Sequence, residues 1–147
     1  MTRKPNNAPL SGESAKPIRI LVVDDSEVAR RAVVSYLRTL PGVEVVDAVT
    51  SGTEALTLLR NVAVDLALVD LQMPAPNGVD TTVSIRRRFP RVRVVLISAT
   101  SSTILRLASM EAGADDCIAK HQLAAALPGT LNRLFAGPQE EKKQSTV

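Results

Sequence analysis

The sequence contains few aromatic residues, one histidine and one cysteine. The single cysteine, Cys117, excludes an internal disulfide and leaves no cluster of cysteine and histidine metal ligands. Aromatic residues make up only 2% of the 147 residues, so Val, Leu, Ile and Ala must fill the core. Apolar residues, at 45%, are numerous enough for that. We therefore expect one compact domain, with Cys117 as a small buried hydrophobic residue.

Long hydrophobic runs and a strong net charge are also missing. No apolar run reaches membrane-spanning length, and the N-terminus lacks the hydrophobic stretch of a secretory signal. We therefore expect a cytoplasmic protein with no membrane contact. The net charge of +3 is small. The one basic cluster falls where a helix should end, and cations there complement the helix dipole. A solvated helix end is favoured over direct binding of nucleic acid for these residues: Arg86, Arg87, Arg88, Arg91 and Arg93.

Both ends of the chain are polar. Residues 1–17 are rich in Pro, Asn, Ser and Lys, which is typical of a disordered leader. Residues 137–147 begin with Gly137–Pro138, a pair that we expect to end the last helix and to start a polar tail. Residues 18–136 are then expected to form the domain.

Strand-type runs alternate with segments of helical period between these ends. Four runs are short, apolar and rich in branched residues, as in strands covered on both faces: Ile18–Val23, Val43–Val49, Asp65–Val69 and Val92–Ile97. A weaker fifth candidate covers Asp116–Ala119. Helical segments follow these runs at 29–40, Thr53–Arg60, Val79–Phe89, Ser102–Ala112 and Leu123–Phe135, the last delayed or kinked by Pro128. Five strand–helix units predict an α/β fold with a parallel sheet and helices on both faces.

Side chains that can take part in catalysis or metal binding directly follow the predicted strands. This is the sheet edge at which open parallel sheets carry their catalytic and binding residues. They are Asp24, Asp25, Asp70, Ser98 and Lys120. Each has an ordinary explanation alone, such as a helix cap or a solvated lysine. Together, clustered carboxylates suit Mg²⁺, and one carboxylate can be a nucleophile toward phosphorus. An ammonium and a hydroxyl can share the charge of the transition state, so the set favours phosphoryl transfer.

Four motifs in this order resemble the receiver domains of two-component response regulators, the CheY-like family. They are ILVVDDS at 20–26, LALVDLQMPAPNG at 66–78, VVLISAT at 94–100 and EAGADDCIAK at 111–120. The resemblance covers about Ile18 to Phe135. It implies a doubly wound, five-stranded parallel sheet in the order 2-1-3-4-5, the flavodoxin/CheY-like (βα)5 fold.

The resemblance also implies a role for each matching residue. Asp70 is implied to be the phosphoacceptor. Asp25, Asp70 and the backbone carbonyl of Gln72 are implied to bind Mg²⁺ directly, and Asp24 to hold a metal-bound water. Two further residues are implied to bind the phosphoryl oxygens: Ser98 and Lys120. In the family, the lifetime of the phosphorylated state depends partly on the side chains at three positions: Gln72, Ala99 and Thr100.

Two positions depart from the family pattern. Cys117 stands where the family carries an aromatic residue whose ring swings inward, so the aromatic half of the usual switch is missing. His121 stands where the family has proline, often after a cis bond, and we expect an ordinary trans bond between Lys120 and His121. For His121 itself, an exposed loop residue is favoured over a phosphodonor or proton relay.

The resemblance implies a stand-alone phosphoacceptor switch that is not an enzyme beyond its own phosphorylation and dephosphorylation. A histidine kinase or phosphotransfer protein would donate the phosphoryl group. A downstream protein, or a second copy of the chain, would bind the face that carries the fourth and fifth helices. Two alternatives stay open: a binding module that needs no phosphorylation, and a phosphatase of the haloacid dehalogenase type. The second would need an acid at residue 26, which is Ser.

Overall fold

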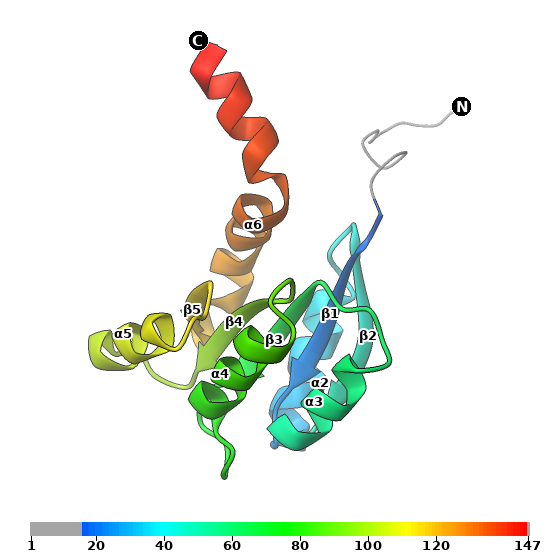
Figure 1. The fold of residues 1–147 in the computed structure, drawn as a ribbon, viewed down its shortest axis with the longest axis vertical. Coiled ribbons are helices and arrows are strands. Elements are labelled where there is room, and N and C mark those ends of the chain that lie inside the picture. The colour runs from blue at the N-terminus through cyan, green and yellow to red at the C-terminus, as the bar shows by residue number, and fades with distance from the viewer. Residues whose placement is uncertain (1–15, 147) are drawn as a thin grey trace.

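The computed structural model describes residues 16–146, and the side chains up to residue 136. Five parallel strands form one sheet in the order β2-β1-β3-β4-β5, with helices on both faces (Figure 1). The strands are β1 (Ile18–Val23), β2 (Val43–Val49), β3 (Leu66–Asp70), β4 (Arg93–Ser98) and β5 (Asp116–Ala119). The helices are α2 (Glu27–Leu37), α3 (Gly52–Leu59), α4 (Gly78–Arg88), α5 (Thr103–Glu111), the 3-10 helix η2 (Lys120–Gln122) and α6 (Leu123–Thr146).

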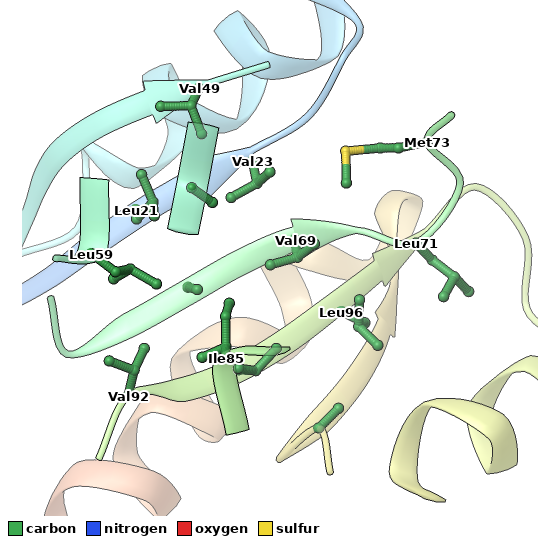
Figure 2. Close-up of a cluster of buried hydrophobic side chains, with 14 residues drawn as sticks. Leu21, Val23, Val49, Leu59, Val69, Leu71, Met73, Ile85, Val92 and Leu96 are labelled. Carbon is green, nitrogen blue, oxygen red and sulfur yellow. The ribbon is translucent and has the colours of Figure 1, made fainter. Parts of the chain in front are cut away.

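The sheet has two covered faces because successive strand residues point to opposite sides. In β1, Ile20 packs with α2 and α6, while its neighbour Leu21 packs with α3 and α4. Figure 2 shows the buried cluster that contains Leu21, in which Leu59 and Ile85 lie over the central strands. Every residue of β3 is buried, so the strand that leads to the predicted acceptor is fixed from both sides.

Polar residues cap the helices that follow the strands. Ser26 begins α2 by accepting a hydrogen bond from the backbone N–H of Ala29, at 3.2 Å. Ser51, Asn77 and Ser102 cap α3, α4 and α5 in the same way. A side-chain acceptor at this position satisfies one of the N–H groups that a helix start leaves unpaired.

The predicted fold class and strand order are confirmed. The bounds of β1, β2 and β5 are those expected, whereas β3 and β4 begin and end one residue later. The pairing of Asp70 with Ile97 and of Ser98 with Ala119 extends the ladder to two of the predicted site residues. Helix α2 stops at Leu37 rather than near Leu40 because its end tightens into a turn.

The last helix differs most from expectation. It begins at Leu123, passes through Pro128, and continues to Thr146, so the expected stop at Gly137–Pro138 is wrong. Proline removes one helical hydrogen bond, that to the carbonyl four residues earlier, and a helix survives where this loss is compensated. For Pro128 that carbonyl belongs to Ala124, and the Tyr36 hydroxyl donates to it at 3.2 Å.

The remaining expectations about the chain ends are not decided by the structure. Of the expected leader at 1–17, residues 1–15 lie outside the described residues, as does residue 147 of the expected tail. Within residues 16–146, no helix combines the length and the apolar character that crossing a membrane requires.

Candidate functional site

The candidate site lies at the carboxyl edge of the sheet, around β1 and β3. These two strands are adjacent although a whole helix–strand unit separates them in the chain, so the strand order reverses here. Crevices at such a reversal are the usual ligand sites of open α/β sheets. Asp24 follows β1, Asp70 ends β3, Ser98 ends β4 and Lys120 follows β5.

Three carboxylates converge at this edge. One oxygen from each of Asp24, Asp25 and Asp70 lies within 4.8 Å of the other two. Asp24 is fully buried and Asp70 is 4% exposed, whereas Asp25 is open to solvent. The three carboxylates therefore offer oxygen ligands of the kind that a hard cation prefers, and one of them, Asp25, faces solvent.

Lys120 is the cation beside these acids. Its Nζ lies 3.1 Å from Asp24 Oδ2 and 3.5 Å from Asp70 Oδ1. Lys120 follows β5, which is the edge strand of the sheet. Its side chain therefore reaches past the end of β4 to the acids at the ends of β1 and β3. One ammonium is therefore shared between two buried carboxylates.

The charge on Asp70 is not fully compensated by this arrangement. Burial and the neighbouring Asp24 carboxylate raise the pKa of Asp70 from 3.8 to about 6, while Lys120 and the backbone N–H of Gln72 oppose the rise. A site with surplus negative charge and oxygen donors suits a hard divalent cation that keeps open positions for water and phosphate. The residues present therefore fit Mg²⁺.

Backbone contacts hold Asp24 in its place. Its Oδ1 accepts a hydrogen bond from the Ser26 N–H at 2.9 Å, and its backbone oxygen accepts one from Arg30 Nη1 at 2.9 Å. Sequence reasoning missed Arg30, because a lone arginine on a helix face carries no signal of a contact six residues back.

Gly78 lets α4 approach the end of β3. A Cβ at this position would lie 2.6 Å from the backbone oxygen of Asp70 and 2.6 Å from Leu71 Cα. Only glycine avoids these backbone contacts, so the helix start and the acceptor strand pack directly on each other.

Gln72 connects the loop after β3 to the loop after β4, next to Asp70, the predicted acceptor. Its Oε1 accepts a hydrogen bond from the backbone N–H of Ala99 at 3.0 Å, and its own N–H donates to Asp70 Oδ1 at 3.3 Å. Ser98 Oγ accepts a bond from the Thr100 N–H at 3.2 Å. The sequence indicated Gln72 as a site residue, but not that its side chain reaches the next loop.

A cavity lies beneath that next loop. It measures about 280 Å³, and its lining includes Ser98, Cys117 and Gln122. Cys117 is partly buried, and Ser109 Oγ lies 3.6 Å from its Sγ. The small side chain of Cys117 thus borders the same cavity as Ser98.

The prediction for the Lys120–His121 bond is confirmed. The cis peptide among the described residues is Ala75–Pro76, and the bond after Lys120 is trans. His121 is exposed within η2, as favoured from the sequence.

The structure thus brings Asp24, Asp25, Asp70 and Lys120 into one site, and it places Ser98 at the end of the neighbouring strand. It holds Gln72 against both Asp70 and the loop after Ser98. The chemical role of each of these residues stays a prediction.

The chain resembles known proteins along most of its length. The family model for the response regulator receiver domain matches residues 20–132. The response regulator protein VraR of Staphylococcus epidermidis is 31% identical over 120 residues, which are 82% of this chain and 57% of that protein. The chain thus spans a little over half the length of this relative.

Solved structures agree in fold. The receiver domain of the response regulator NarL from Mycobacterium tuberculosis is 28% identical, with a TM-score of 0.70 over 78% of this chain and 95% of that one. The CheX-CheY-BeF3-Mg complex of Borrelia burgdorferi shares the fold at 24% identity, with a TM-score of 0.74 over 82% of this chain and 90% of that one. The chain therefore belongs to the response regulator receiver domains of two-component systems.

Proposed function

We propose that this receiver accepts its phosphoryl group on Asp70. The observation that supports this most is the geometry of that carboxylate. It is buried at the end of β3, lies 3.5 Å from the Lys120 ammonium, and shares the site with two other acids within 4.8 Å. Of the three acids, only Asp70 is the last residue of β3, the strand that lies between β1 and β4. Ser98 ends the neighbouring strand β4, and the Lys120 side chain reaches Asp70 from beyond it.

The transfer forms one bond and breaks one. An Asp70 carboxylate oxygen attacks phosphorus, the bond from phosphorus to the donor atom breaks, and the donor leaves with that electron pair. Lys120 Nζ is positioned to accept part of the negative charge that spreads over the phosphoryl oxygens. Ser98 retains its hydroxyl proton, which it can donate to another of these oxygens.

The acidic set would hold Mg²⁺ during this reaction. Asp25, Asp70 and the backbone carbonyl of Gln72 would bind the ion directly, and Asp24 would bind one of its waters. The ion supplies charge neutralisation, so the carboxylates and an incoming phosphoryl group no longer repel one another. Burial and the neighbouring Asp24 carboxylate raise the pKa of Asp70 and so disfavour its charged form, which is the reason to expect this requirement.

The phosphoryl group would come from a phosphohistidine of a histidine kinase or of a phosphotransfer protein. Its charge would draw Ser98 and the following loop toward Asp70 and bias the face of α5 and α6 toward a second arrangement. A protein partner, or a second copy of the chain, would then bind that face. Helix α5 offers it two exposed apolar side chains, Ile104 and Leu107, which are 78% and 61% exposed.

Phosphorylation by a small donor tests the proposal. Acetyl phosphate with Mg²⁺ should add the mass of one phosphoryl group to the intact chain, and the Asp70→Asn variant should gain nothing. Asp47→Asn is the matched control, because Asp47 is exposed on β2, at the edge of the sheet. A wild-type chain without added mass would favour the phosphate-independent binding module, and steady hydrolysis of phosphate esters would favour a phosphatase.

A further inference from the structure

Gln72 joins the acceptor carboxylate to the loop that follows Ser98. Its backbone N–H donates to Asp70 Oδ1, and its side-chain Oε1 accepts the backbone N–H of Ala99 at 3.0 Å. The two partners lie 27 residues apart in the chain, on loops after β3 and after β4. The exposed Gln72 side chain therefore connects the loop after β3 to the loop after β4.

The loop held by this bond borders a cavity of about 280 Å³. Ser98 and residues 100–103 of the loop line this cavity, and so does Cys117. A large ring at position 117 would fill part of this cavity and pack against the loop. The small Cys117 side chain leaves that contact out, so the bond from Ala99 to the Gln72 amide takes a larger share in holding the loop.

Helix α5, which the loop enters, is fixed separately. Arg106 Nη1 donates to the backbone oxygen of Cys117 at 2.7 Å and lies 3.2 Å from Asp116 Oδ1. Ser102 caps the first turn of the helix. A movement of the loop would therefore be confined to the residues between Ser98 and this cap, where Ala99 is the residue bound by Gln72.

We propose that the Gln72 side chain is a latch that holds the switch loop in its unphosphorylated position. The inference rests on the proposed function of Asp70. Ala99 directly follows Ser98 and donates its N–H to Gln72 Oε1, so a movement of Ser98 toward a phosphoryl group on Asp70 would displace the Ala99 N–H from the Gln72 amide. In this proposal the bond forms in the resting state alone, so its loss shifts the equilibrium toward the closed loop.

Two variants of Gln72 separate the hydrogen bond from the bulk of the side chain. Gln72→Met keeps the length of the chain and removes the acceptor, whereas Gln72→Glu keeps an acceptor oxygen. Gln122→Met is the matched control, because Gln122 is also an exposed glutamine and lines the cavity together with Ser98 and Cys117. All variants are compared with the wild type in the 147-residue chain.

Hydrogen exchange of the Ala99 amide, measured by NMR without ligand, tests the bond itself. In Gln72→Met this amide should exchange roughly 2- to 10-fold faster, the range that follows from the net contribution of one hydrogen bond. Gln122→Met and Gln72→Glu should exchange like the wild type. An Ala99 amide that exchanges equally fast in the wild type and in Gln72→Met overturns the latch.

Titration with beryllium fluoride and Mg²⁺, a non-covalent phosphoryl mimic, tests the consequence. Gln72→Met should reach half-saturation at a concentration lower by the same roughly 2- to 10-fold factor, while its urea midpoint of unfolding without ligand should not rise above that of the wild type. Gln122→Met should match the wild type, and Gln72→Glu should not bind more tightly. If the wild type responds and Gln72→Met responds identically, the latch fails and the proposed function stands. If no protein responds, the proposed function fails and the latch with it.

Discussion

Replacing Asp70 with Asn should stabilise the domain when divalent cations are absent. Burial and the Asp24 carboxylate raise the pKa of Asp70 from 3.8 to about 6. Each pKa unit is worth about 1.4 kcal/mol, so keeping this carboxylate ionised at pH 8 costs at most about 3 kcal/mol. Asn removes the charge and keeps an oxygen for the Gln72 N–H, but it loses the ion pair with Lys120. We expect the free energy of unfolding to rise by about 1–3 kcal/mol.

The effect should depend on pH in one direction. Because the folded-state pKa of Asp70 is raised, the folded wild type binds more protons than the unfolded chain between about pH 4 and about pH 6. The stability that Asp70 contributes is therefore present below about pH 4 and is lost as the pH rises through about 6. Urea unfolding in EDTA should show the widest gap between variant and wild type above pH 7, closing toward pH 4.

Asp25→Asn is the matched control for this experiment. Asp25 belongs to the same acidic group but is exposed, so its replacement should change the free energy of unfolding by less than about 0.5 kcal/mol. Saturating Mg²⁺ should stabilise the wild type more than Asp70→Asn, because the variant lacks one proposed ligand. If Asp70→Asn is less stable than the wild type in EDTA at pH 8, the Lys120 ion pair outweighs burial and the reasoning is refuted.

Two other substitutions test the packing that supports the site. Gly78→Ala should lower the free energy of unfolding by about 1–3 kcal/mol or more, because the new Cβ meets backbone atoms at 2.6 Å. Gly129→Ala, with nothing within 4 Å, should instead raise it by about 0.5–1 kcal/mol, and equal losses in urea unfolding would contradict the steric argument. Tyr36→Phe should cost about 0.5–1.5 kcal/mol by removing the hydroxyl from the Ala124 carbonyl. That cost should shrink in a Pro128→Ala background, where a helical N–H is restored, and a double-mutant cycle without coupling would argue against the compensation.

Much of the sheet was predictable because three of its strands, β1, β3 and β4, are largely buried on both faces. Runs such as Leu66–Val69 are continuously apolar, and strands of this kind stand out from the amphipathic helices between them. The convergence of Asp24, Asp70 and Lys120 was predictable too, since parallel strands end at a common edge. The strand order came from the resemblance to receivers, because periodicity does not say which strands are neighbours.

The contacts between loops were not predictable in this way. The bond between Gln72 and Ala99 depends on the path of two loops. Loops lack the periodic sequence pattern from which the direction of a side chain can be predicted in a helix or strand. The hydroxyl of Tyr36 reaches a carbonyl 88 residues further along, which only the packing of α2 beside α6 reveals. The continuation of α6 past Pro138 likewise contradicts the local signal, because a helix can tolerate the loss of one internal hydrogen bond.

The position of the phosphoryl group is the most direct test of the central claim. The wild-type chain is treated with acetyl phosphate and Mg²⁺, reduced with borohydride, which converts an aspartyl phosphate to homoserine, and digested for mass spectrometry. Homoserine should appear at Asp70, with Asp24 and Asp25 unmodified. Reduction at another aspartate, or a chain in which Asp70 stays unmodified while phosphoryl transfer occurs, would contradict the account.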